Sequence, residues 1–249
     1  MAALETAVAA LPTPTRDDPT AAAVATELVP TVAAEPVMLA DGLELLYFYV
    51  AAREKPCRFN CNTTALILGE MRNGTDRALD TPGLTFTFLD GSGNVLGAVT
   101  ASGLLQVMEP GQVMPFEAAI TEEDPQLGQW DREEITLADP WGTDTGVELF
   151  GGSRLEIRDE RETAHDEDGF RLEGAVYNGF AYPVKGAIVQ AAIYDPDGRY
   201  AGRSGSYDLP GVTIPPGKTA AFVIDSGYGP FDPVALTGPD YTYRLMVGH

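Results

Sequence analysis

The sequence has little positive charge. Its 249 residues contain 16 lysines and arginines against 37 aspartates and glutamates, so the formal net charge is −21 at pH 7. The lysines are few, namely Lys55, Lys185 and Lys218, and no basic cluster occurs. A surface this acidic repels phosphate groups, which disfavours binding to nucleic acid or to anionic membranes.

Long apolar runs are also missing. The longest apolar stretch, 43–52, is interrupted by Glu44 and is typical of a strand. Because a membrane-spanning helix needs about 20 apolar residues, no membrane span is predicted. The N-terminal residues lack the basic start and apolar core of a signal peptide. Residues 1–38, rich in Ala, Thr and Pro, are expected to form a disordered, semi-rigid linker.

The two cysteines, Cys57 and Cys61, are too few for a closed zinc site. Three interpretations stay open. The cysteines form a local disulfide, which would indicate an oxidising compartment, or they are ordinary thiols. The third is a redox-active pair, which is disfavoured because the spacing is not Cys-x-x-Cys. No metal site and no cofactor is predicted from them.

Catalytic motifs are scarce as well. Of the two histidines, His165 lies in a charged stretch and His249 ends the sequence, and no Gly-x-Ser-x-Gly motif accompanies them. The neighbouring carboxylates of Glu122, Glu123 and Asp124 are the candidates for a hydrolytic pair. We expect them on a solvent-facing loop, so no catalytic residue is predicted.

An acidic stretch at 159–169 is the candidate for calcium binding. Six carboxylates occur there, but their spacing does not match an EF-hand loop. We expect a solvated hairpin loop instead. The Asp195-Pro-Asp197-Gly198 segment resembles the start of a calcium loop and is better explained as a turn.

What the sequence does contain is glycine and proline, at 27 and 19 residues, between short apolar runs. This composition favours an all-β fold with many turns. The runs repeat. A shift of 105 residues aligns six identical residue pairs without a gap: Gly69 and Gly174, Asn73 and Asn178, Gly74 and Gly179, Asp90 and Asp195, Gly93 and Gly198, Gly97 and Gly202.

The residues between these pairs also correspond. Ile67, Gly69 and Met71 alternate as one strand face, and the residues 105 positions later do the same. After one inserted residue the match resumes at a Pro-Gly turn, followed by Phe116 in one copy and Phe222 in the other. The sequence therefore predicts two tandem all-β domains, 39–142 and 143–249.

Each repeat is expected to have about seven strands, as in a β-sandwich. In the first repeat we place them near 43–52, 64–72, 83–89, 94–100, 104–108, 113–120 and 133–138. In the second they fall near 153–158, 169–177, 186–194, 199–204, 211–214, 219–225 and 240–247.

This pattern resembles the FxLYD family of immunoglobulin-like domains from microbial envelope proteins. The matching elements are the strand ends Gly69–Asn73 and Gly174–Asn178, and the segments Phe86–Asp90 and Ala191–Asp195. The name-giving Tyr is replaced by Leu89 in the first copy, and the Phe by Ala191 in the second. The resemblance covers about 50 residues of each repeat and implies two immunoglobulin-like sandwiches that serve as spacers or binding modules, often behind a lipoprotein or membrane anchor.

Four aromatic residues near predicted loops are candidates for a partner surface: Trp130, Trp141, Tyr228 and Phe231. For the two tryptophans, packing between the domains is the alternative. The leading hypothesis is a non-catalytic extracellular or cell-envelope protein that binds an unidentified protein or envelope ligand and was anchored through a removed N-terminal segment. A calcium-dependent adhesion module and a hydrolase with carboxylates at the domain junction are the alternatives.

Overall fold

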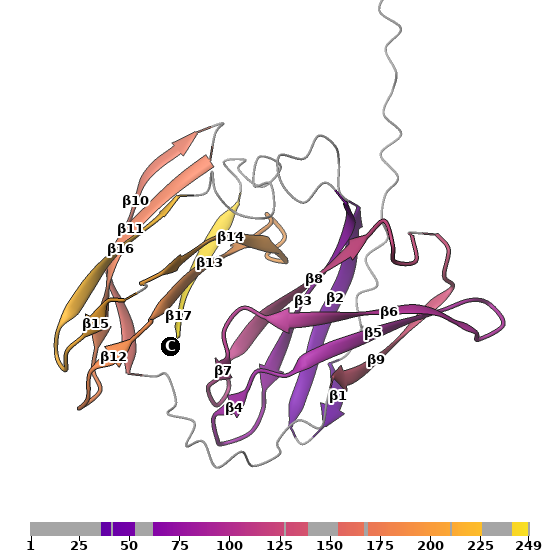
Figure 1. Ribbon diagram of the computed structural model, residues 1–249, viewed down its shortest axis with the longest axis horizontal. Helices are drawn as coiled ribbons and strands as arrows, with labels where there is room; N and C mark the ends of the chain where they lie inside the picture. Colours follow the sequence, from indigo (N-terminus) through magenta and orange to yellow (C-terminus); the bar gives the residue numbers. More distant parts are fainter. Residues whose placement is uncertain are drawn as a thin grey trace, which may run out of the picture.

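The chain folds into strands. The computed structural model describes residues 36–40, 42–52, 62–126, 128–138, 154–166, 169–209, 211–225 and 241–248. The regular secondary structure within these ranges consists of β-strands (Figure 1). For the described residues, the expectation of an all-β chain is confirmed. Within these ranges no helix is long and apolar enough to cross a membrane.

The first half of the molecule, β1 to β9, forms one antiparallel seven-stranded sheet and a short strand pair. The sheet has the order β1-β2-β3-β8-β6-β5-β9, and β4 pairs with β7. The strands are β1 (Val37–Ala40), β2 (Leu43–Ala52), β3 (Thr63–Asn73), β4 (Leu79–Asp80), β5 (Gly83–Leu89), β6 (Val95–Gly103), β7 (Val107–Met108), β8 (Val113–Thr121) and β9 (Arg132–Ala138).

The second half pairs its strands in the same order. Its ladders β10-β11-β16, β14-β13-β17 and β12-β15 correspond to β2-β3-β8, β6-β5-β9 and β4-β7. The strands are β10 (Leu155–Asp166), β11 (Gly169–Asn178), β12 (Val184–Lys185), β13 (Ile188–Tyr194), β14 (Tyr200–Asp208), β15 (Thr213–Ile214), β16 (Thr219–Asp225) and β17 (Thr242–Gly248). In Figure 1 the two halves lie side by side, indigo to magenta on the right and orange to yellow on the left.

Two buried asparagines show why the repeated residues are the same. Asn73 and Asn178 are both fully buried at the ends of β3 and β11. The Asn73 side-chain amide donates to the carbonyls of Arg77 (2.8 Å) and Met108 (3.0 Å). The Asn178 amide donates in the same way to Tyr182 (2.9 Å) and Ile214 (2.7 Å). Each asparagine therefore ties the end of its strand to the following loop and to the short strand pair of its half.

The repeated glycines and aspartates have equally local causes. A Cβ on Gly69 would lie 2.5 Å from the Phe116 ring, and one on Gly174 would lie 2.7 Å from the Phe222 ring, so only glycine fits beneath each phenylalanine. In the hairpin turns, Asp90 and Asp195 each accept backbone N–H bonds from the residues two and four positions later. The predicted turns at 90–94 and 195–199 are confirmed.

Most predicted strands are found within a few residues, and two expectations need correction. The acidic stretch 159–169 is not a loop, because β10 and β11 continue as a hairpin ladder to Asp166 and Gly169. Residues 159–162 are accommodated there because their charged side chains are exposed, and Arg161 pairs across the strands with Glu173 (2.7 Å). The predicted linker also ends earlier, since Val37 already pairs with Leu45.

Two clusters of buried apolar side chains form the core. One lies in the second half and is centred on Val176, Ile193 and Phe222. The other lies mainly in the first half, and it contains Phe86 and Phe116. This cluster also includes Ala192, Tyr200 and Met246, which come from strands of the second half. The two halves therefore share buried surface.

Candidate functional site: the junction between the halves

Two strands at the junction, β3 and β13, are buried on both faces. In β3, Ile67 and Met71 belong to the core of the first half, and the intervening Leu68 and Glu70 are also buried. In β13, Val189 and Ile193 point into the core of the second half. Its alternate residue Ala192 is fully buried within the cluster of the first half. The outer face of the β13 sheet thus packs on the outer face of the β3 sheet.

Tyr200 is the most buried polar side chain at this junction, with no exposed surface. Its backbone N–H donates to the hydroxyl of Tyr47 (2.7 Å), and its carbonyl accepts from the hydroxyl of Tyr49 (2.8 Å). Its own hydroxyl donates to Oε2 of Glu117 (3.0 Å). One residue of the second half is therefore held by three side chains from two strands of the first.

Residues of the other half balance the charge of Glu117 and donate a hydrogen bond to it. Its Oε1 forms an ion pair with Nε of Arg203 (2.7 Å), while its Oε2 accepts from Tyr200. Burial raises the pKa of Glu117, because the loss of solvation outweighs the attraction of Arg203. A buried carboxylate of this kind is tolerated only when its partners stay in place.

A second carboxylate has a matching arrangement. Glu70 is 8% exposed, and its Oε1 accepts from the hydroxyl of Tyr194 (2.8 Å). Arg244 approaches the same oxygen (3.5 Å) and also donates to the backbone carbonyl of Val113 (3.2 Å). Each of the two glutamates from the first half is thus paired with one tyrosine and one arginine from the second half.

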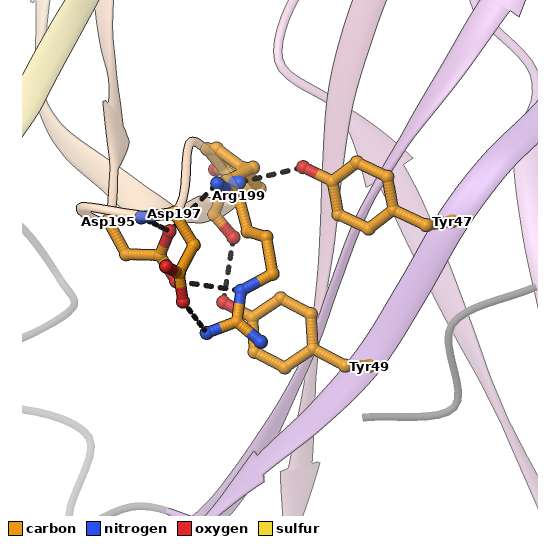
Figure 2. A network of polar contacts seen from close by, with 6 residues as sticks. Tyr47, Tyr49, Asp195, Asp197 and Arg199 are labelled. Atoms are coloured by element: carbon orange, nitrogen blue, oxygen red, sulfur yellow. Dashed lines mark hydrogen bonds and ion pairs between the residues drawn. The ribbon is translucent and has the colours of Figure 1, made fainter. Parts of the chain in front are cut away.

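The hairpin turn at 195–199 completes the contact. Figure 2 shows Tyr47 and Tyr49 projecting from the first half toward the turn that carries Asp195 and Arg199. The guanidinium of Arg199 is held by Asp195 (2.9 Å) and lies 5.8 Å from the centre of the Tyr49 ring. This distance is within the range of a cation–π contact.

The tyrosines at the junction are all held in the neutral form. Burial is the largest cause, and it raises the pKa of Tyr47, Tyr49, Tyr194 and Tyr200 above the ordinary value of 10.0. The carboxylate of Glu70 raises the pKa of Tyr194 further. Neutral hydroxyls are the form that donates to the two glutamates, so the arrangement persists through neutral pH.

A pocket of about 350 Å³ opens beside these contacts. The first half contributes residues 81–83 and 102–106 to its lining, and the second half contributes Ile188, Gln190, Arg203 and Gly248. The pocket therefore exists only while the two halves are docked.

The residues predicted as a partner surface are only partly described. Trp130 is half-buried and packs on Phe88, with the ring centres 4.4 Å apart. Trp141, Tyr228 and Phe231 lie outside the described residues, and so do Cys57 and Cys61. Whether these residues form a partner surface or a disulfide stays a prediction.

The candidate catalytic carboxylates directly follow the end of β8. Glu122 and Glu123 are exposed, as expected. Asp124 instead closes a turn, because its carboxylate accepts from the backbone N–H and the hydroxyl of Thr121, both at 2.8 Å. Within the described ranges no three His, Cys, Asp or Glu side chains are grouped so as to hold a metal ion.

The junction was not predicted from the sequence. The signal was a break in alternation, since Leu66, Ile67 and Leu68 are apolar in succession, as are Ala191, Ala192 and Ile193. Continuous apolar runs indicate strands buried on both faces. Together with the two tyrosines Tyr47 and Tyr49 on the neighbouring β2, these runs could have indicated that the outer face of the β3 sheet is covered.

The comparisons with known proteins give no close relative. No family model matches the chain, and no curated protein matches it. Among solved structures it is similar to red sea bream transglutaminase, at 12% identity and a TM-score of 0.23, over 74% of this chain and 26% of that one. It is also similar to a calcium-binding mutant of beta-glucuronidase 2 from Bacteroides uniformis, at 13% identity and a TM-score of 0.21, over 72% of this chain and 24% of that one. Each match spans about a quarter of the larger protein, and similarity this low identifies neither fold nor function.

Proposed function

We propose that this chain is a non-catalytic extracellular or cell-envelope protein made of two immunoglobulin-like sandwiches of the FxLYD type. Residues 39–142 and 143–249 are the two modules. They act together as one rigid unit that serves as a spacer or presents a surface to a protein or envelope ligand.

The shared strand order supports the two-module interpretation. The ladders β2-β3-β8 and β10-β11-β16 have the same order, as do β6-β5-β9 and β14-β13-β17. The buried asparagines Asn73 and Asn178 make equivalent bonds at the equivalent strand ends. Duplicated strand order with duplicated strand-end chemistry is what two copies of one domain would have.

The junction carries the functional proposal. A spacer or a composite binding surface needs modules in a fixed orientation, and modules joined only by a linker move independently by default. Here Tyr200 is fully buried against Tyr47, Tyr49 and Glu117 of the other half. Separating the halves would break these hydrogen bonds and expose Ala192 and Met246, which are buried in the cluster of the first half, to water, and this opposes hinge motion.

The same contacts support a non-catalytic role. Glu70 and Glu117 are the carboxylates that the junction brings together, and each is already paired with an arginine and a tyrosine. Carboxylates in such pairs stabilise structure, whereas a hydrolytic pair must face a substrate.

The proposed location rests on composition. The Ala, Thr and Pro residues of 1–38 are typical of a stalk that holds a domain away from a surface, and the net charge of −21 keeps such a protein soluble.

Surface labelling tests the location. Lys185 and Lys218 are exposed, so a membrane-impermeant amine reagent will reach them on any molecule outside the cell. We expect the chain in its native cells to be labelled as strongly before lysis as after it. A Lys185→Arg, Lys218→Arg variant is the matched control and should lose most of the label. Labelling that appears only after lysis would contradict an extracellular location.

A further inference from the structure

The pocket at the junction has the properties of a ligand site. Its volume of about 350 Å³ lies within the range of small-molecule pockets. Its lining comes from both halves, through 81–83 and 102–106 on one side and Gln190 and Arg203 among the residues on the other. Pockets of this kind occur preferentially where two domains meet.

Two residues of the lining each carry a buried polar atom that lacks a partner within the described chain. Gln190 is only 6% exposed, and its buried Oε1 accepts no hydrogen bond from the described residues. Oγ1 of Thr81 is buried and unpaired in the same way. Nearly all buried polar groups in proteins are hydrogen-bonded, so two such atoms in one pocket indicate that a bound molecule supplies the missing bonds.

The charge of the lining residues indicates whether the bound molecule is charged or neutral. Among the described residues of the lining, Arg203 is the one ionisable side chain, and Glu117 already balances its charge. A ligand with a net charge would therefore lose its solvation without an available counter-charge. The pocket also offers apolar surface from Leu104, Leu105 and Ile188. A ligand that fits has C–H surface as well as hydrogen-bond donors and is neutral.

We propose that the junction pocket binds a neutral polyhydroxylated molecule of monosaccharide size. Its hydroxyls would donate to Oε1 of Gln190 and exchange hydrogen bonds with Oγ1 of Thr81, and its C–H faces would lie against the leucines. The inference rests on the fixed orientation proposed above, because neither half alone forms the pocket.

Direct binding to the full chain tests the inference. The probes are glucose, galactose and N-acetylglucosamine, with acetate and methylammonium as charged controls. We expect saturation-transfer difference NMR to give saturable binding of at least one sugar with a Kd of about 1 mM. The same sugar should raise the melting temperature, because a ligand that binds only the folded state stabilises it. Neither charged control should do so.

Variants of the orphaned atoms make the test specific. Gln190→Met keeps the side-chain length and removes Oε1, and Thr81→Val removes Oγ1. We expect each to weaken sugar binding at least about tenfold. Gln190→Met should raise the melting temperature of the sugar-free protein by about 2 °C, because an unpaired buried acceptor is gone. The matched control Thr136→Val, at an exposed position on β9, should leave binding unchanged.

Two results would overturn the inference. One is the absence of saturable binding for every sugar up to about 100 mM, which is far above the expected Kd. The other is unchanged sugar affinity in both Gln190→Met and Thr81→Val. If the halves are shown to share one orientation and no sugar binds, only the pocket inference is wrong. If the halves move independently, the proposed function is wrong as well.

Discussion

The hydroxyl of Tyr200 in β14 donates a 3.0 Å hydrogen bond to the carboxylate of Glu117 in β8, across the junction between the two halves. Tyr200 is fully buried, and Glu117 is also paired with Arg203. This contact joins residues 83 positions apart and lies on no strand ladder. It marks the junction as a structured interface rather than an accidental contact.

The first prediction removes the hydroxyl at the centre of the junction. Tyr200→Phe keeps the ring and leaves one oxygen of the buried Glu117 carboxylate without its donor. We expect a loss of about 1–3 kcal/mol in the free energy of unfolding, measured by urea denaturation. Thr136→Val is the control, because it removes a hydroxyl at an exposed position on β9. Equal stability of the wild type and Tyr200→Phe would contradict this role.

The second prediction concerns alkaline pH. Burial raises the pKa of Tyr47, Tyr49, Tyr194 and Tyr200 in the folded chain, so their contribution to stability is present below pH 10.0 and is lost as the pH rises above it. Of the 10 tyrosines in the chain, we expect at least these four to ionise late and together with loss of structure. Absorbance of tyrosinate and circular dichroism followed together in one titration will test this. Ionisation of all tyrosines near pH 10 with the fold intact is the contrary result.

The third prediction concerns mild acid. Burial raises the pKa of Glu117 above its unfolded value of 4.5, so the folded chain binds this proton more tightly than the unfolded chain does. The stability that this proton contributes is complete below pH 4.5 and is lost as the pH rises through the folded pKa. Relative to Glu117→Gln, which does not titrate at this position, the wild type should therefore lose stability as the pH rises above 4.5.

The melting temperatures of the wild type and Glu117→Gln are measured at each pH. Their difference isolates this effect, because the other titrating groups are common to both proteins. A difference that stays constant with pH would show that Glu117 has no raised pKa. A difference that changes in favour of the wild type as the pH rises would show that Arg203 dominates over burial.

The fourth prediction compares the two halves at equivalent positions. Asn73→Ala and Asn178→Ala each leave buried carbonyls without their donor, at Met108 and Ile214. We expect each to cost at least about 2 kcal/mol and the two costs to be similar. The control is Asn94→Ala in the exposed turn, which should cost less than about 1 kcal/mol. A large cost at only one asparagine would argue against equivalent folds in the two halves.

The sequence predicted each half better than it predicted their relation. Turn residues such as Asp90 and Gly93 are limited by local backbone geometry, so their repetition 105 residues later was informative without any structure. Alternation around Ile67 and Met71 likewise placed β3 within two residues of its observed bounds.

The junction was harder to predict, because it depends on contacts between residues distant in sequence. Glu70 and Glu117 look like ordinary surface carboxylates in a chain with 37 acidic residues. Only the approach of Tyr194, Tyr200 and Arg203 makes them interface residues. The acidic stretch was taken for a loop for a related reason, since composition does not show that its charges pair across the strands of a hairpin.

The most direct test of a fixed orientation between the two halves is the measurement of backbone residual dipolar couplings in the weakly aligned full chain. Couplings from β2 to β9 and from β10 to β17 are fitted separately to the structure of each half. The junction around Tyr200 and Glu117 predicts that both sets give one common alignment tensor. Two tensors that differ in magnitude or direction would contradict it, because they would show that the halves reorient independently.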